Sequence, residues 1–439
     1  MTSSARTLRT MGLLSLVTLA LGAARELLIA RDLRASADAD LFFRGLVAVA
    51  TIRACALAVY RARWIPAASS TSTATLLRAG ARSATWIGAC GVLSLIPLVG
   101  PRPLLAALAA PESAAAIAAL AIAAFLAAWS SHLRALAERR GREIRGFGVD
   151  WGLALGTIAG IVALPGSAAL GPSLGLLGGM VVGTAMVLPR GDADYDDSST
   201  DYEHSSTGAG EPAPRVPAAE RGAPDPAIER ARTTDDRRPI GLLLDALLYG
   251  NLGVVDSLFT HLLAVGSLAV LSYAGLFVNS ALMLLTGAVT VVALRLAADP
   301  ERGPPMGRWA AFGGLTVALG LGVIAALLGW APIAGWIERV LGWDLARSVQ
   351  PIVLWSLPYA FLRLANTIGR QRRLVHGDLR AVVAWDAAGL AARSLLLALA
   401  IPGLGLLAFP LAAALAEVLQ LAAWVRTRAP SGPQRRATP

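Results

Sequence analysis

The feature that most constrains this chain is a series of apolar runs, most of them about 20 residues long, the length of helix that spans the hydrocarbon core of a bilayer. A β-barrel would show shorter segments of alternating polarity instead. Hydrophobic residues make up 55% of the chain and charged residues 15%, whereas a soluble domain carries about 25% charged residues. The sequence therefore predicts an all-α polytopic membrane protein.

A polar segment divides these runs into two sets of six. Residues 190–238 are rich in Asp, Ser, Thr, Pro, Gly and Arg, a composition that predicts a disordered linker. We expect an N-terminal lobe (1–189), the linker (190–238), a C-terminal lobe (239–428) and a basic tail (429–439). The twelve expected transmembrane helices cover residues 11–30, 41–60, 84–99, 113–133, 147–164, 170–188, 240–263, 268–294, 309–328, 349–368, 382–401 and 404–425.

The two halves repeat one order of features. Asp150 precedes an apolar run, Pro165-Gly166 and a second run, and Asp386 precedes the same pattern around Pro402-Gly403. Six helices in each half make this a parallel repeat, which suits alternating access to a central cavity between two lobes. The loops from even to odd helices are rich in Arg, so the positive-inside rule predicts cytoplasmic termini and a cytoplasmic linker. This distribution accounts for the net charge of +10 without a nucleic-acid partner.

No motif of an enzyme is present. The chain has no Gly-rich phosphate loop with a Lys, and none of its four histidines has the spacing of a metal ligand. Both cysteines, Cys55 and Cys90, lie in apolar runs, where a thiol usually serves only packing. We predict no catalytic residue, no metal and no cofactor, with coupling to Na⁺, H⁺ or the membrane potential as the source of energy.

Charged residues in the first two expected helices are candidates for a substrate cavity, because charge at membrane depth is costly and is kept for a partner, a cavity or a substrate. Asp40 and Arg44 are four residues apart and could pair on one helical face. Arg53 falls on the opposite face from Arg44, so we favour Arg53 as lining the cavity and Arg44 as paired or interfacial. The cavity candidates are Arg25, Glu26, Asp40, Arg44 and Arg53.

Carboxylates in the second half are candidates for coupling to a cation or proton. Asp245 and Asp256 share a face because eleven residues are close to three helical turns, and Asp386 shares a face with Arg393, seven residues on. The ion-coupling candidates are Asp245, Asp256 and Asp386. The alternative for all these charges is that they pair with one another and only fix helix packing.

Two stretches carry the pattern of a known family. The first covers the first expected helix, the loop and the second helix, and its characteristic positions are Leu21, Gly22, Arg25, Glu26, Ala30, Arg31, Asp40, Phe42 and Phe43. In the second, residues 254–296, they are Asp256, Gly266, Ser267, Tyr273 and Ala274. Both stretches resemble the corresponding parts of the MurJ/MviN lipid II flippases.

The resemblance implies the fold of the multidrug/oligosaccharidyl-lipid/polysaccharide flippases, with two six-helix lobes around a cationic cavity in the bacterial cytoplasmic membrane. It also implies that Arg25 and Arg53 bind the pyrophosphate of an undecaprenyl-linked peptidoglycan precursor. An arginine suits this role because its fork binds two oxygens and its charge does not titrate away. The chain departs from the family at Leu19 and Leu276, where the family has Arg, and shows about twelve helices where the family has two more.

We therefore expect a transporter that moves a polyprenyl-pyrophosphate-linked envelope precursor, such as lipid II, across the membrane by alternating access. One alternative keeps the fold and changes the cargo to another glycolipid or a small molecule. The other is a membrane scaffold for envelope synthesis that binds partner proteins through the linker.

Overall fold

The computed structural model describes residues 3–64, 73–100, 104–105, 109–139, 143–188, 248, 252–280, 282, 306–375 and 378–426. Within these ranges the regular elements are all helices, and each of the twelve expected helices overlaps a helix of the structure. The prediction of an all-α polytopic fold is thus confirmed. The predicted linker and the tail after residue 428 lie outside the described residues.

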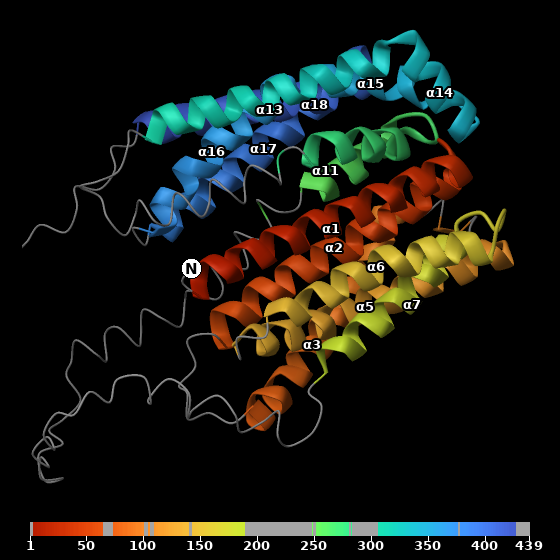
Figure 1. Cartoon of the computed structure of the whole chain (residues 1–439), viewed down its shortest axis with the longest axis vertical. Helices are drawn as coiled ribbons and strands as arrows, with labels where there is room; N and C mark the ends of the chain where they lie inside the picture. The colour runs from red at the N-terminus through yellow and green to blue at the C-terminus, as the bar shows by residue number, and fades with distance from the viewer. Residues whose placement is uncertain are drawn as a thin grey trace, which may run out of the picture.

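The N-terminal lobe is built around one central helix (Figure 1). α5 contacts α2, α3, α6 and α7, while α1 packs on α6. The side chains that α5 buries are mostly alanines, such as Ala123, Ala124 and Ala127, which let neighbouring backbones approach closely. The helices of this lobe are α1 (Ser3–Leu33), α2 (Ala37–Trp64), α3 (Thr73–Val99), α5 (Pro111–Arg139), α6 (Glu143–Ala163) and α7 (Leu170–Val187).

The C-terminal lobe contains helices that pack mainly with one another. α13 contacts α15 and α16, and α18 contacts both α16 and α17. Figure 1 shows α11 between this group and the N-terminal lobe. The elements are α11 (Leu252–Phe259), η1 (Thr260–Leu262), the helix Ser267–Ser280, α13 (Met306–Gly329), α14 (Ala331–Leu341), α15 (Leu345–Trp355), α16 (Leu357–Val375), α17 (Leu379–Leu404), η2 (Gly405–Leu407) and α18 (Ala408–Arg426).

Six helical ranges among the described residues are long and apolar enough to cross a membrane, or seven if a bent pair is one span. The bent pair joins Gly313–Gly329 to Ala331–Leu341 at an angle of 74°, and the range Leu379–Ala423 contains both α17 and α18. These lengths and compositions are those of a multi-pass membrane protein. The ranges that qualify singly are Ala37–Arg61, Thr75–Val99, Pro111–Arg139, Arg145–Ala163, Leu170–Val187 and Leu379–Ala423.

The prediction of a single helix over residues 349–368 is wrong. The structure has two helices there, α15 and α16, which meet at Ser356. Pro358 explains the new start, because proline lacks the N–H that a helix interior needs but fits the first turn. α15 itself begins earlier than expected, where the Asp344 carboxylate accepts a hydrogen bond from the Arg347 N–H at 3.0 Å. α14 is a further helix, which we did not predict from the sequence.

Glycine brings α6 and α7 into backbone contact. A Cβ placed on Gly175 would lie 2.2 Å from the Gly156 carbonyl oxygen, and one on Gly179 would lie 1.9 Å from that of Gly152. No side chain fits at either position while the backbones keep this distance. The pair is therefore a small-residue interface of the kind that lets membrane helices approach closely.

We predict that Gly175→Ala lowers the free energy of unfolding by about 1–3 kcal/mol, because the added methyl group forces two backbones apart. The measurement is the thermal unfolding midpoint of the purified protein in detergent. Gly178→Ala is the matched control, since a Cβ at Gly178 meets nothing within 4 Å on the same helix. Equal midpoints for the two variants would contradict this account of the interface.

Candidate functional site

The two lobes are joined at the end of the bundle where α1 gives way to α2, which we call the loop end. α1 ends at Leu33 and α2 begins at Ala37, with Arg34 in the left-handed region between them (φ 54°). The turn lies against the C-terminal lobe so closely that a Cβ on Gly266 would be 2.4 Å from the Ala35 carbonyl oxygen. Gly266 itself has a φ of +88°, which also favours glycine.

Asp40 binds the C-terminal lobe through its carboxylate. One oxygen accepts a hydrogen bond from the Gly266 N–H at 2.8 Å and the other from the Ala269 N–H at 2.9 Å. These N–H groups lie at the start of the helix Ser267–Ser280, where they have no partner within their own helix and where the helix dipole favours negative charge. Asp40, only 7% exposed, thus caps a helix of the opposite lobe.

Arg44 makes a second set of contacts one turn further along α2. Its guanidinium donates to the Leu98 carbonyl at 2.8 Å and to the Ser257 carbonyl at 3.0 Å, and it also contacts the His261 ring. The two carbonyls lie near the ends of α3 and α11, where unpaired carbonyls carry partial negative charge. Arg44, also 7% exposed, therefore joins three helices from both lobes.

Aromatic residues complete this connection. The ring of Tyr273 lies edge-on to Phe43, with centroids 5.4 Å apart, and its hydroxyl donates to the Arg34 carbonyl at 2.9 Å. The indole N–H of Trp343 donates to the Ala30 carbonyl at 2.7 Å. We refer to the contacts of Asp40, Arg44, Tyr273 and Trp343 across the lobes as the interlobe contact.

The two arginines that were predicted to line the cavity lie at different depths in the bundle. Arg25 lies eight residues before the end of α1 and Arg53 sixteen residues after the start of α2, so they are about 12 and 24 Å from the loop end at 1.5 Å per residue. Arg25 pairs with the adjacent Glu26, and its Nε is buried without a hydrogen-bond partner. Arg53 pairs with Asp150 of α6.

Arg53 belongs to a chain of charges that links three helices of the N-terminal lobe. Asp150 also accepts from Arg134 at 3.0 Å, and Glu138 accepts from Arg134 at 3.0 Å and from Arg61 at 2.6 Å. Three arginines thus face two carboxylates. The spacing of Arg134 and Glu138, four residues apart on one helix, was a sequence signal for part of this network.

Carboxylates and arginines are balanced in the described interior of the C-terminal lobe. Arg393 makes two hydrogen bonds to Asp256, at 2.7 and 2.9 Å, so this partner lies on another helix and not on the face that Arg393 shares with Asp386. Arg370 lies 3.4 Å from Asp386. Two of the three ion-coupling candidates, Asp256 and Asp386, thus have an arginine beside them. The third, Asp245, lies outside the described residues.

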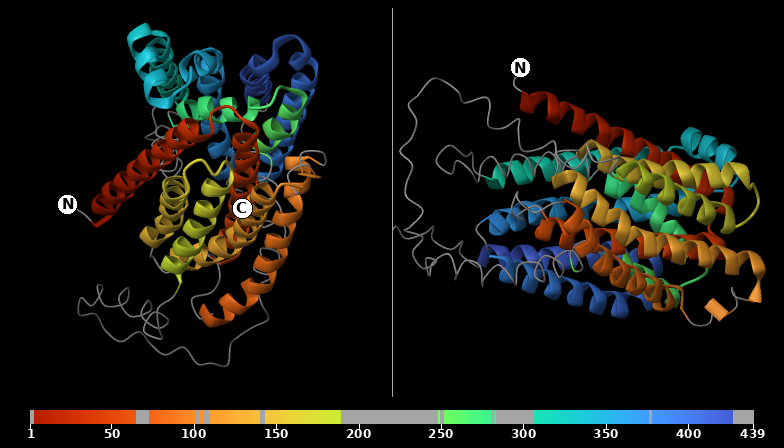
Figure 2. Two further views of the ribbon diagram at one scale, coloured as in Figure 1. Left: turned by 90° about the vertical axis from the view of Figure 1, so that its right-hand side faces the viewer. Right: turned by 90° about the horizontal axis from the view of Figure 1, so that it is seen from below.

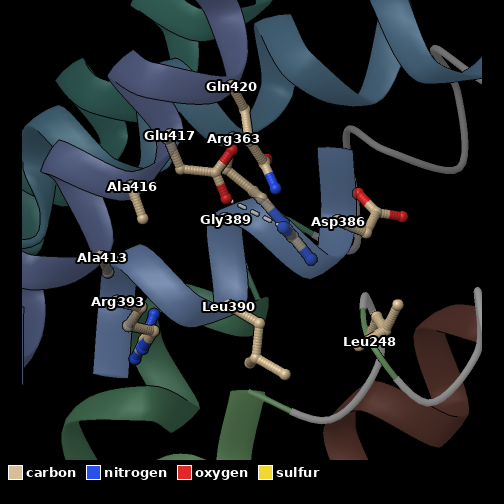
Figure 3. Close-up of a pocket in the computed structure, with 10 residues that line it drawn as sticks. All are labelled: Leu248, Arg363, Asp386, Gly389, Leu390, Arg393, Ala413, Ala416, Glu417 and Gln420. Carbon is tan, nitrogen blue, oxygen red and sulfur yellow. Dashed lines mark hydrogen bonds and ion pairs between the residues drawn. The ribbon is translucent and has the colours of Figure 1, made fainter. Parts of the chain in front are cut away.

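A third ion pair and a small cavity lie beside these two (Figure 3). Glu417 accepts from Arg363 at 2.8 Å and from the Asn366 amide at 2.6 Å. The cavity has a volume of about 10 Å³, the space that one ordered water needs. The Nε of Arg393 is buried nearby without a hydrogen-bond partner. The lining residues are Leu248, Arg363, Asp386, Gly389, Leu390, Arg393, Ala413, Ala416, Glu417 and Gln420.

No set of three His, Cys, Asp or Glu side chains that could hold a metal occurs among the residues with a described position. Cys55 is buried and Cys90 exposed, and neither forms a disulfide.

Solved structures with the same fold are membrane transporters. No family model and no curated protein sequence matches the chain. A structure of the lipid II flippase MurJ in an inward closed conformation matches with a TM-score of 0.66 at 10% identity, covering 94% of this chain and 86% of the other. The DinF-BH multidrug transporter of the MATE family, in complex with R6G, matches with a TM-score of 0.57 at 14% identity over 96% of both chains.

A third match is an inward-facing MATE family transporter of the MOP superfamily, with a TM-score of 0.55 at 14% identity, covering 94% of this chain and 96% of the other. These values establish the shared fold, and they agree with the fold that the resemblance to MurJ/MviN implied. Because MurJ and MATE structures both match over most of the chain, the fold alone does not select a cargo.

We predict that Asp256→Leu lowers the free energy of unfolding by about 3–5 kcal/mol, because it leaves the buried Arg393 guanidinium unpaired. The double variant with Arg393→Met removes both charges and is expected to be more stable than the single variant. The measurement is thermal unfolding in detergent. Arg347→Ala, at an exposed ion pair whose arginine side chain is 89% exposed, is the control and should change stability by less than about 0.5 kcal/mol. A double variant less stable than Asp256→Leu would contradict the pairing.

Proposed function

We propose that this protein is a transporter, not an enzyme, that moves a polyprenyl-pyrophosphate-linked envelope precursor across the bacterial cytoplasmic membrane by alternating access. The observation that carries the proposal is the interlobe contact. Its hydrogen bonds join separate lobes at one end of the bundle, and they come from side chains that can release their partners without unfolding either lobe. Two lobes closed at one end are what alternating access around a site between them needs.

The proposed orientation places the loop end on the outer side of the membrane. This follows from the Arg-rich loops at the opposite end, such as the one after α5, which the positive-inside rule assigns to the cytoplasm. Both termini are then cytoplasmic, and the interlobe contact is an outer gate.

The charge distribution supports an anionic cargo held mainly by the N-terminal lobe. In its charge network Arg53 is one of three arginines that face two carboxylates, and Arg53 keeps 19% of its side chain exposed. Arg25 is 17% exposed and has an unpartnered Nε. A guanidinium with free N–H groups binds the paired oxygens of a pyrophosphate well. In the three ion pairs around the small cavity of the C-terminal lobe, each arginine faces one carboxylate, which favours a role in coupling or packing for Asp256 and Asp386.

A second candidate is export of another glycolipid or of a small molecule. The match to a MATE transporter in complex with R6G favours it, and the loss of family arginines at Leu19 and Leu276 is consistent with a less cationic cavity. A scaffold for envelope synthesis is the third candidate. It predicts that removal of residues 192–236 abolishes function while loss of Arg25 or Arg53 does not.

We predict that Asp40→Ala opens the loop end. Leu268, which is 3% exposed and lies between the Gly266 and Ala269 N–H groups that bind Asp40, is replaced by Cys in a Cys55→Ser, Cys90→Ser background. The rate at which this cysteine reacts with a polar maleimide is measured in detergent. The rate should rise by at least about tenfold, which corresponds to about 1.4 kcal/mol, because two hydrogen bonds to a charged group are lost. Asp38→Ala, in the same first turn of α2, is the matched control. Equal rates in the two variants would mean that Asp40 does not hold the lobes together.

The test of the cargo is rescue of a conditional lipid II flippase depletion strain. Wild type is expected to rescue growth, and Arg25→Ala and Arg53→Ala to lose rescue at equal membrane levels. Arg78→Ala, an exposed arginine on α3, should retain it. Failure of a well-inserted wild type would reject lipid II as the cargo. Lower accumulation of a lipophilic cation in the same cells would then favour the small-molecule exporter.

A further inference from the structure

The helix α14 lies across the other helices at the loop end (Figures 1 and 2). α13 ends at Gly329 and α14 begins at Ala331, with an angle of 74° between their axes. Trp330 between them has an extended backbone, and Pro332 fits the first turn of the new helix. A helix at this angle to membrane-spanning neighbours lies close to the plane of the membrane.

The side chains of α14 form three faces with different surroundings. Leu341 is buried against the protein, and α14 contacts α1, α13 and α15. Trp336 and Val340 are 59% and 47% exposed on a second, apolar face. Glu338 and Arg339 are exposed on a third, charged face. An apolar and a charged face on one helix that lies in the membrane plane are the marks of an interfacial helix.

An open groove lies at the bend between α13 and α14. It has a volume of about 490 Å³ and is lined by Val323, Ala326, Leu327, Gly329, Trp330 and Gln350. Gln350 is the polar side chain of this lining, and its amide donates to the Ala325 carbonyl at 3.1 Å, so its N–H is directed at the backbone. The groove surface is therefore apolar in effect.

The groove continues a surface that faces lipid along α13. Leu315, Leu319, Val323 and Leu327 are all more than 40% exposed at intervals of four residues, and the last two line the groove. Trp330 in the groove lining and Trp336 on α14 are both exposed, and they mark the level of the membrane interface, where tryptophan is enriched. An apolar groove that continues this exposed apolar surface at this depth is accessible to lipid chains.

We propose that the groove and the apolar face of α14 bind one phospholipid of the leaflet at the loop end. An acyl chain occupies the groove beneath Trp330, and the headgroup lies level with Glu338 and Arg339. Any double-chain phospholipid of that leaflet fits, because the exposed charges of α14 carry both signs.

This lipid would also brace the interlobe contact. α14 is followed by Gly342 in the left-handed conformation and by Trp343, which bonds to Ala30 of α1 and lies beside Tyr273. A lipid that holds α14 in place thus holds Trp343 against the N-terminal lobe. This second step rests on the proposed alternating access, whereas lipid binding itself does not.

Ala326→Trp tests the site, because the indole fills the groove from an exposed position. Native mass spectrometry of the full-length protein, purified in mild detergent, measures the phospholipid that stays bound. Wild type should retain one phospholipid, and Ala326→Trp should retain about tenfold less, a factor that corresponds to about 1.4 kcal/mol. Leu315→Trp adds the same side chain on the same exposed face outside the groove and should retain the lipid. Equal retention in both variants would overturn the proposal.

A spin label at position 336 or 339 gives a measurement that does not depend on the groove variant. In lipid nanodiscs the label at 336 should be relaxed mainly by oxygen, which partitions into the bilayer, and the label at 339 mainly by a water-soluble nickel complex. Dominant relaxation by nickel at 336 would place α14 in water and overturn the proposal. If the protein retains the lipid but does not rescue the flippase depletion strain, the lipid site is supported and only the proposed cargo is rejected.

Discussion

The interaction on which the arrangement of the lobes depends is the capping of one lobe's helix by the other lobe's carboxylate. The first N–H groups of the helix Ser267–Ser280 need an acceptor, and Asp40 supplies two oxygens from across the interface. Because the cap is charged and nearly buried, it fixes the position of α2 relative to this helix. Arg44, one turn further on, uses the complementary partner, the carbonyl ends of α3 and α11. The contacts between the lobes thus use both kinds of helix end. A carboxylate binds the N–H groups at the start of one helix, and a guanidinium binds carbonyls near the ends of two others.

The sequence pointed to most of the residues that form this arrangement, but we predicted other partners for them. The two stretches that resemble MurJ/MviN flippases lie far apart in the chain, yet the structure brings them into contact through Asp40 with Gly266 and Phe43 with Tyr273. We listed Asp40 and Arg44 as cavity candidates because charge at membrane depth suggests a substrate, and we favoured Arg44 as paired or interfacial. Their partners at helix ends, most of them backbone groups, could not be predicted, because helix ends are not visible as charges in a sequence.

Hydrophobic periodicity could not predict the ion pairs between helices or the bend at Trp330. A hydrophobic pattern gives the face of a helix that is buried but not the helix against which it packs, so the pairing of Arg393 with Asp256 and of Arg53 with Asp150 required the fold. The bend at Trp330 was missed for a similar reason. Apolar residues continue from α13 into α14, so the sequence pattern gives no sign of the 74° angle between the two helices.

The bilayer explains why so few polar contacts can hold two large lobes together. Lipid chains are as apolar as the lobe surfaces, so separating those surfaces within the membrane does not expose them to water, and the hydrophobic effect contributes little to their association. The net energy that favours the closed arrangement then comes mainly from the hydrogen bonds and aromatic contacts at the loop end, each of modest size. Under the proposed alternating access, opening the loop end would exchange these polar partners for water, while the ion pairs and glycine contacts within each lobe stay intact.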